Sequence, residues 1–119
     1  MIGESTAHFS VENAMSRLPG PYDAGSVALF AHGTLLVKLY APRGRDPQTP
    51  HTRDEVYVVM RGTGTFFNGE TRQPFSPGDF LFVEAGVPHR FEDFSPDFAT
   101  WVMYLGPEGG ELASPQQAG

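Results

Sequence analysis

Two histidines and one glutamate are the residues of this chain best suited to chemistry. His51 precedes Glu55 by four positions, and His89 opens a later apolar segment. Two imidazoles and one carboxylate with open coordination positions form the facial arrangement that suits non-haem iron(II) and that other divalent metals accept. If the segments that carry these residues face each other, the side chains converge. Spacing alone leaves a solvated strand edge as the alternative, because a histidine and a glutamate four residues apart also occur by chance.

The remaining residue types exclude several other chemistries. His8 lies in the N-terminal segment and His32 precedes a turn glycine, so both are predicted to be structural or solvated. The absence of cysteine excludes disulfides, thiolate metal sites and thiol nucleophiles. The chain has neither a Gly-x-Ser-x-Gly elbow nor a glycine-rich phosphate loop before a helix. Serine-based acyl transfer and nucleotide binding are therefore not expected.

Size and charge limit the function further. A chain of 119 residues predicts one domain that buries roughly two-thirds of its unfolded surface. The formal net charge is −6 and the basic residues are scattered, so neither nucleic acid nor an anionic membrane surface is an expected partner. No apolar run approaches about 18 residues, and residues 1–20 lack the pattern of a secretory signal. We therefore expect a soluble, cytoplasmic protein.

The elements that must position these residues are predicted to be short strands. From residue 26 onward apolar side chains recur with a period of two, and 14 glycines and 11 prolines punctuate the chain. The predicted strands cover residues 27–31, 34–41, 55–61, 65–68, 71–75, 80–84, 89–94 and 98–105. Tight turns such as Asn68-Gly69 leave no room for crossover helices, so the strands are predicted to be antiparallel. The fold class is therefore all-β.

The N-terminal residues differ from this pattern. Residues 10–18 favour a short amphipathic helix with Ser10 as its N-cap, although an irregular arm is the alternative for so short a segment. Its apolar stripe consists of Val11, Ala14, Met15 and Leu18. We therefore expect an N-terminal arm (1–25), a β-barrel (26–105) and a flexible tail (106–119).

The order of these residues resembles the paired motifs of the cupin superfamily. The matching residues are His51, Glu55, Gly62, Gly78, Asp79, Gly86 and His89. The resemblance implies a single antiparallel, jelly-roll-like β-barrel over most of the chain. It also implies that His51, Glu55 and His89 bind a divalent ion, with iron, manganese, nickel and zinc as candidates. Cupins include dioxygenases, isomerases, sugar epimerases and non-enzymes, so the resemblance alone selects no reaction.

One departure from the family pattern affects the metal. The leading histidine of the first motif is replaced by Thr49, which is a poor ligand. In extended backbone Thr49 shares a face with His51, so we expect it at the fourth position, where it or Gln48 could contact a metal-bound water. The alternative is a barrel that has lost its metal and binds only an organic ligand.

Strand alternation predicts the lining of the site, because residues two and four positions beyond a strand ligand share its face. The predicted lining residues are Tyr57, Val59, Phe91 and Asp93. Asp93 and Tyr57 are also candidate general bases. Arg53 lies between two proposed ligands and could pair with an anionic substrate, or simply with Asp54 in solvent.

Two functions from different classes follow. The first is a metal-binding cupin that acts on a small organic molecule as a dioxygenase, isomerase or lyase. The second is a non-catalytic barrel that binds or senses a small molecule, with or without a metal. In both cases we expect a homodimer, because the apolar residues of the N-terminal arm call for a partner surface and two-fold pairs are the commonest oligomers.

Overall fold

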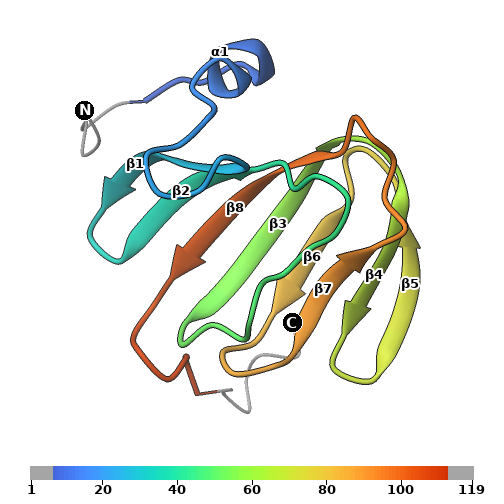
Figure 1. Ribbon diagram of the computed structural model, residues 1–119. Coiled ribbons are helices and arrows are strands. Elements are labelled where there is room, and N and C mark those ends of the chain that lie inside the picture. Colours follow the sequence, from blue (N-terminus) through green and yellow to red (C-terminus); the bar gives the residue numbers. More distant parts are fainter. Residues whose placement is uncertain (1–6, 113–119) are drawn as a thin grey trace.

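A computed structural model describes residues 7–112 and contains two antiparallel sheets packed face to face (Figure 1). The elements in chain order are α1 (Val11–Met15), β1 (Ser26–His32), β2 (Leu35–Tyr40), β3 (Asp54–Arg61), β4 (Gly64–Asn68), β5 (Thr71–Phe75), β6 (Phe80–Val83), β7 (His89–Glu92) and β8 (Ala99–Leu105). The predicted all-β class and the antiparallel pairing are confirmed.

The sheets have different sizes. The larger one has five strands in the order β1-β2-β8-β3-β6, and the smaller one has three in the order β5-β4-β7. The larger sheet occupies the left and centre of Figure 1 and the smaller one the right. Among the described residues no strand pairing joins the two sheets into a closed cylinder, so the jelly-roll-like barrel takes the form of an open sandwich. Pro77 and Asp93 lie in two of the loops that pass between the sheets. Pro77 has no N–H to donate to a neighbouring strand, and the left-handed backbone of Asp93 (φ 51°) departs from strand geometry, so the strand pairing ends at both positions.

Side chains of β3 alternate between the inside and the outside of the sandwich. The buried inner set is Glu55, Tyr57 and Val59, and the half-buried outer set is Val56, Val58 and Met60. The inner core combines residues of both sheets: Tyr57, Val59, Phe66, Phe75, Val83, Phe91, Phe98 and Val102. Each fully buried aromatic or aliphatic side chain contributes about 1.5–3 kcal/mol. This core fixes the sheet spacing, and Glu55 and His89 lie beside it.

The N-terminal arm packs on the outside of the larger sheet. Helix α1 is shorter than the predicted helix over 10–18, because Ser16 donates its hydroxyl back to the Asn13 carbonyl at 2.6 Å and Pro19 follows. The predicted N-cap is confirmed, since the Ser10 side chain accepts from the Asn13 N–H at 3.0 Å. Ala14, Met15 and Leu18 pack in a second, outer cluster with residues of β1, β2 and β8. The part of the predicted arm before residue 7 lies outside the described residues.

The chain after β8 turns back toward the start of β3. The Gly109 N–H donates to the Thr52 carbonyl at 2.6 Å, and the Glu111 N–H donates to Asp54 at 3.1 Å. Gly109 and Glu111, which belong to the predicted flexible tail, are thus hydrogen-bonded to the start of β3 and to the residues just before it. Residues 113–119 lie outside the described part of the chain.

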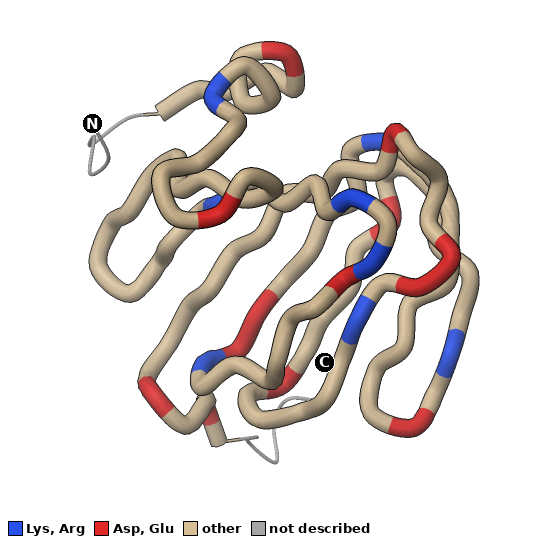
Figure 2. Tube along the Cα trace, in the orientation of Figure 1, with Lys and Arg blue, Asp and Glu red and all other residues tan. Residues whose placement is uncertain are grey.

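Charged residues lie mainly in loops (Figure 2). Strands β1, β6 and β8 carry no Lys, Arg, Asp or Glu. On the smaller sheet Arg72 and Arg90 both pair with Glu92 and lie over the ring of Phe67. Between residues 7 and 112 there is no helix with the length and apolarity needed to cross a membrane.

Candidate metal centre

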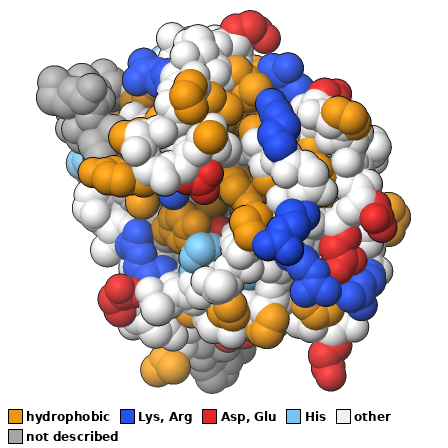
Figure 3. Space-filling model, viewed as in Figure 1, with side chains coloured by type: hydrophobic (Ala, Val, Ile, Leu, Met, Phe, Trp, Pro, Cys, Tyr) orange, Lys and Arg blue, Asp and Glu red, His pale blue; other side chains and the backbone are white. Residues whose placement is uncertain are grey.

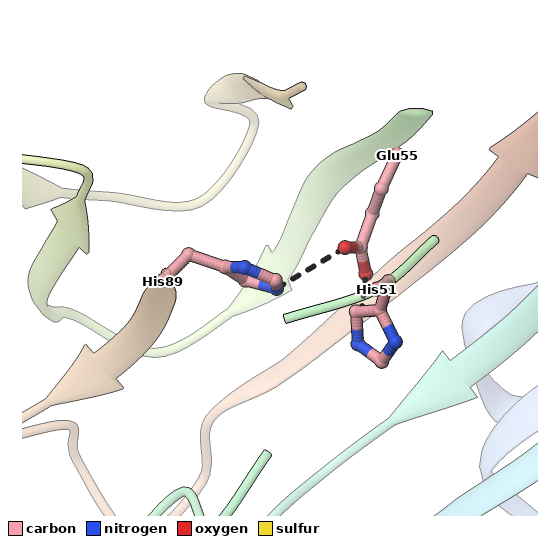
Figure 4. Close-up of side chains that lie close together, drawn as sticks. All are labelled: His51, Glu55 and His89. Carbon is pink, nitrogen blue, oxygen red and sulfur yellow. Dashed lines mark ion pairs between the residues drawn. The ribbon is translucent and has the colours of Figure 1, made fainter. Parts of the chain in front are cut away.

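Three segments bring the predicted ligands together. His51 lies in the loop before β3, Glu55 lies on β3, and His89 is the first residue of β7 in the opposite sheet. Their side chains point toward one another (Figure 4), with all the candidate ligand atoms within 4.8 Å of each other. Within residues 7–112 this is the group of His, Cys, Asp and Glu side chains whose geometry could hold a metal ion.

Backbone contacts hold the two histidine-bearing loops in place. The Gly86 N–H donates to the His51 carbonyl at 2.7 Å, and Gly86 has a φ of +83° that L side chains rarely adopt. Asp54 accepts a hydrogen bond from the Ala85 N–H at 3.0 Å. The turn before His89 is therefore tied directly to the segment that carries the other ligands.

The ligand atoms of Glu55 and His89 face one another without hydrogen-bond partners among the described residues. The Nε2 atom of His89 lies 3.1 Å from one oxygen of Glu55, and Nε2 of His51 lies 3.9 Å from the other. His89 donates Nδ1–H to the Val87 carbonyl at 2.9 Å, which leaves its Nε2 as the metal-facing atom. Within the described residues both Glu55 carboxylate oxygens and His89 Nε2 are buried without a hydrogen-bond partner. Such atoms cost about 1–3 kcal/mol each, and a divalent cation would satisfy them together, so these residues fit a metal.

The protonation of the site follows from burial. Burial lowers the pKa of His51 despite the opposing charge of Glu55, which keeps the imidazole neutral and able to ligate. Burial also disfavours charge on His89, but the Glu55 contact and the Val87 carbonyl outweigh it and raise the pKa. Burial raises the pKa of Tyr57 and Tyr104, so both phenols are neutral donors at physiological pH.

A cavity of about 280 Å³ opens beside these residues. Its walls come from β2, β3, β8 and the loop that precedes β3, and they include Lys38, Tyr40, Gln48, His51, Tyr57 and Tyr104. Figure 3 shows histidine atoms beside a hollow lined largely by apolar side chains. The His51 side chain is 30% exposed whereas Glu55 and His89 are almost completely buried. A small molecule could therefore approach the candidate metal centre from the side of His51.

The predicted lining residues separate into two groups. Tyr57 lines the cavity, and its hydroxyl donates to the Gln48 side chain at 3.1 Å. Val59 and Phe91 are buried in the inner core instead. Asp93 is exposed and lies away from the ligands, because β7 ends at Glu92 and the positive φ of Asp93 breaks the alternation.

Arg53 binds loops rather than the cavity. Its guanidinium donates to the carbonyls of Thr34 at 2.5 Å and Gly106 at 3.2 Å. Asp54, the expected partner in solvent, instead accepts from the backbone N–H groups of Ala85 and Glu111. Both residues therefore fasten the loops around the site.

The loop before β3 presents Gln48 more closely to the ligands than Thr49. Thr49 lines the cavity but is exposed, and its hydroxyl makes no hydrogen bond within residues 7–112. The Gln48 side-chain oxygen lies 3.1 Å from Nε2 of His51. The expectation for Thr49 assumed extended backbone, whereas residues 41–53 form an irregular loop.

Sequence reasoning did not assign the residues of the neighbouring strands that reach the cavity. Lys38 and Tyr40 come from β2, and Tyr104 comes from β8, where its hydroxyl lies 3.4 Å from Nε2 of His51. Strand alternation places Lys38 and Tyr40 on the same face of their strand, but it does not show which face lies inside the sandwich. Asp46, buried under Gln48, carried no motif signal.

Known proteins resemble this chain over part of its length. Residues 36–103 match the family model described as "Cupin domain". The chain is 36% identical over 63 residues to an uncharacterised protein, SCO3923, of Streptomyces coelicolor, a match that covers 53% of this chain and 60% of that protein. It is 40% identical over 65 residues to acireductone dioxygenase 1 of Pectobacterium atrosepticum, covering 50% of this chain and 37% of the relative. The chain thus spans less than two-thirds of either relative.

A solved structure shows the same fold. The cupin-2 domain protein of Shewanella frigidimarina superposes with a TM-score of 0.64 at 16% identity, covering 82% of this chain and 94% of the other. The family match spans more than half of the 119 residues and includes Glu55 and both motif histidines. On this match, and with the antiparallel sandwich that accompanies it, the chain belongs to the cupin family.

Proposed function

We propose that this cupin is a metal-dependent enzyme that acts on a small organic molecule, with His51, Glu55 and His89 as the protein ligands. The observation that carries the proposal is the convergence of His51 with the buried, unpartnered ligand atoms of Glu55 and His89 beside a cavity. Iron, manganese, nickel and zinc all accept such a donor set. When bound, the metal supplies Lewis-acid polarisation and open coordination positions.

Among the reactions considered, we propose dioxygenation first. The relative named acireductone dioxygenase supports it, and so does a donor set of two histidines and one carboxylate. The chain's own residues would position the substrate. Lys38 can hold an anionic oxygen, and Tyr104 can orient an oxygen next to His51. Isomerisation and elimination by a lyase are the competing outcomes.

Elemental analysis of protein purified without a histidine tag tests the metal. We expect close to one divalent ion per chain, which treatment with a chelator removes. Oxygen consumption is then measured with a panel of small oxygenated compounds, alongside a screen for co-purified molecules. Protein that neither contains nor binds iron, manganese, nickel or zinc would overturn the proposal.

A non-catalytic binding or sensing barrel is the second candidate. It is favoured by the position of Asp93, because that exposed residue cannot serve the cavity as the predicted general base. Chelation separates the two candidates. An enzyme loses its activity when the metal is removed, whereas a carrier or sensor that needs no metal still binds its ligand.

We also propose that the protein forms a homodimer through the outer face of the larger sheet. An apolar patch there lies outside the cluster covered by the N-terminal arm and consists of Val56, Val58, Phe80, Phe82 and Met103. Phe80 is 68% and Phe82 51% exposed on the edge strand β6. Contiguous apolar surface of this kind marks protein interfaces. Sedimentation at tens of micromolar should show twice the 13.0 kDa chain mass, and a monomer would contradict the proposal.

The remaining predictions concern the surroundings of the protein. A location in the cytoplasm, and the absence of nucleic-acid and membrane partners, stay predictions from composition and charge.

A further inference from the structure

We infer that the side-chain oxygen of Gln48 is the fourth protein ligand of the proposed metal centre, and that Asp46 is the residue that positions it. The inference rests on the proposed function, because it concerns the ion that His51, Glu55 and His89 would bind. It replaces Thr49, the residue that motif order assigns to that position.

Asp46 determines which end of the Gln48 amide faces the ligands. A carboxylate only accepts hydrogen bonds, and Asp46 accepts one from Nε2 of Gln48 at 2.6 Å. The amide oxygen must therefore point the other way, toward His51 and Tyr57. If the amide were reversed, its oxygen would face a carboxylate oxygen of Asp46. Its N–H₂ group would face the Tyr57 hydroxyl, which donates to the Gln48 oxygen in the observed orientation. The orientation of Gln48 is thus fixed by chemistry.

Asp46 is itself held firmly. Only 8% of its surface is exposed. It accepts from the backbone N–H of Phe91 at 2.9 Å and of Gln48 at 3.2 Å, and from the hydroxyl of Tyr40. These donors come from β7, from the loop before β3 and from β2, so Asp46 links the two sheets beneath the cavity. Gln48 is therefore presented by a rigid support.

The distances suit coordination. Two ligand atoms that are each about 2.1 Å from a metal and at right angles lie about 3.0 Å apart. The Gln48 oxygen is 3.1 Å from Nε2 of His51, and Nε2 of His89 is 3.1 Å from Glu55. In the metal-free chain the Nε2–H of His51 donates to Gln48, and a metal would replace that proton. Because a carbonyl oxygen has two lone pairs, Gln48 can bind the ion and still accept from Tyr57.

An amide ligand would also affect the choice of metal. It gives a donor set of two nitrogens and two oxygens, whereas a histidine at the fourth ligand position would give three nitrogens and one oxygen. Carbonyl oxygen suits manganese, whereas imidazole suits zinc, nickel and iron. We therefore expect Gln48→His to increase the preference for zinc over manganese relative to the natural chain.

Calorimetric titration with Mn²⁺ and Zn²⁺ tests the inference on the full chain, with Gln48→Ala as the main variant. Thr49→Ala is the matched control one residue away. We expect Gln48→Ala to weaken Mn²⁺ binding by at least about tenfold, and Thr49→Ala to change it by less than about twofold. Asp46→Asn should also weaken binding, because one Asp46 oxygen accepts from the Gln48 side chain and the Phe91 N–H while the other accepts from Tyr40 and the Gln48 N–H, and an amide has only one accepting oxygen.

Two further measurements distinguish the outcomes. Thermal melts of the metal-free variants establish that each is folded. The visible absorption of bound Co²⁺ should change in Gln48→Ala and stay constant in Thr49→Ala. If Gln48 only supported the other ligands, the Co²⁺ spectrum of Gln48→Ala would not change. Equal affinities and equal Co²⁺ spectra of Gln48→Ala and Thr49→Ala would overturn the inference, as would Thr49→His binding more tightly than the natural chain. Natural protein that binds no metal would remove the proposed centre and this ligand with it.

Discussion

The inner and outer faces of the larger sheet have opposite chemistry. Alternate residues of β3 place Glu55 and Tyr57 inside and Val56 and Val58 outside. The inner face carries the buried carboxylate, whereas the outer face is apolar and half exposed. A charged group excluded from water is costly unless an ion or hydrogen bonds compensate for it. Buried polar side chains on the inner face therefore indicate the candidate site. Exposed apolar side chains on the outer face indicate a surface where a partner could bind.

The outer face is itself covered unequally. Residues of the arm cover its β1–β2 end through the cluster around Leu39 and Trp101. The patch around Phe80 and Phe82 at the β6 end remains uncovered in the single chain. The inner face is continuous with the core, so a change there should affect stability or metal binding, while a change in the uncovered patch should affect association.

The largest contrast concerns phenylalanines of the two faces. Phe91→Ala empties a fully buried position that contacts Tyr57, Phe66, Phe75 and Phe98. We expect it to lower the free energy of unfolding by about 3–5 kcal/mol, and Phe82→Ala to cost less than about 1 kcal/mol in the monomer. Urea denaturation at low protein concentration measures both. Similar losses for the two variants would show that the faces do not differ as described.

The next contrast concerns the histidines. His51→Ala removes a proposed ligand, so we expect metal affinity to fall by more than about 100-fold, beyond the usual effect of residues that merely support a ligand. His32→Ala, which changes an exposed histidine at the end of β1, should leave affinity unchanged. Titration calorimetry with manganese and zinc compares them. Equal affinities would favour the barrel that binds an organic ligand without a metal.

A double change in the uncovered patch should separate association from metal binding. Phe80→Ser with Phe82→Ser removes exposed aromatic surface from β6. We expect the dimer dissociation constant to rise by at least about tenfold, because aromatic side chains dominate interface energies. Metal affinity should be unchanged. Sedimentation velocity over a concentration series checks the first expectation. A dimer of unaltered stability would place the interface elsewhere.

The smallest effect is expected from the exposed ion pairs of the smaller sheet. Hydrogen bonding from Arg72, together with the charge of Arg90, lowers the pKa of Glu92 below its ordinary 4.5. A lowered carboxyl pKa contributes stability above the unfolded pKa, and this contribution is lost as the pH falls through the folded pKa. Glu92→Gln should therefore be slightly less stable than the natural chain at pH 7, with a difference that shrinks below about pH 4.5. Urea denaturation at pH 7 and pH 3.5 measures it, and a difference that grows in acid would contradict this sign.

Local sequence determined the strands, their turns and the ligand-bearing motifs. The period of two placed Glu55 and Tyr57 on one face, and Asn68-Gly69 marked the hairpin between β4 and β5. These are properties of neighbouring residues, because alternation and left-handed turns need no distant partner. The proximity of His89 to His51 and Glu55 could be expected from the order of the cupin-like motifs, because the resemblance implies that the two motifs lie side by side.

Tertiary contacts decided the remaining features. Asp93 left the predicted face because its backbone turns at the end of β7. Arg53 is held by carbonyls 19 and 53 positions away in the chain, so no local pattern could show that it avoids the cavity. Gln48 rather than Thr49 faces His51 because the buried carboxylate of Asp46 holds the amide. In an irregular loop the direction of a side chain depends on distant hydrogen-bond partners, and only the folded chain brings those partners within reach.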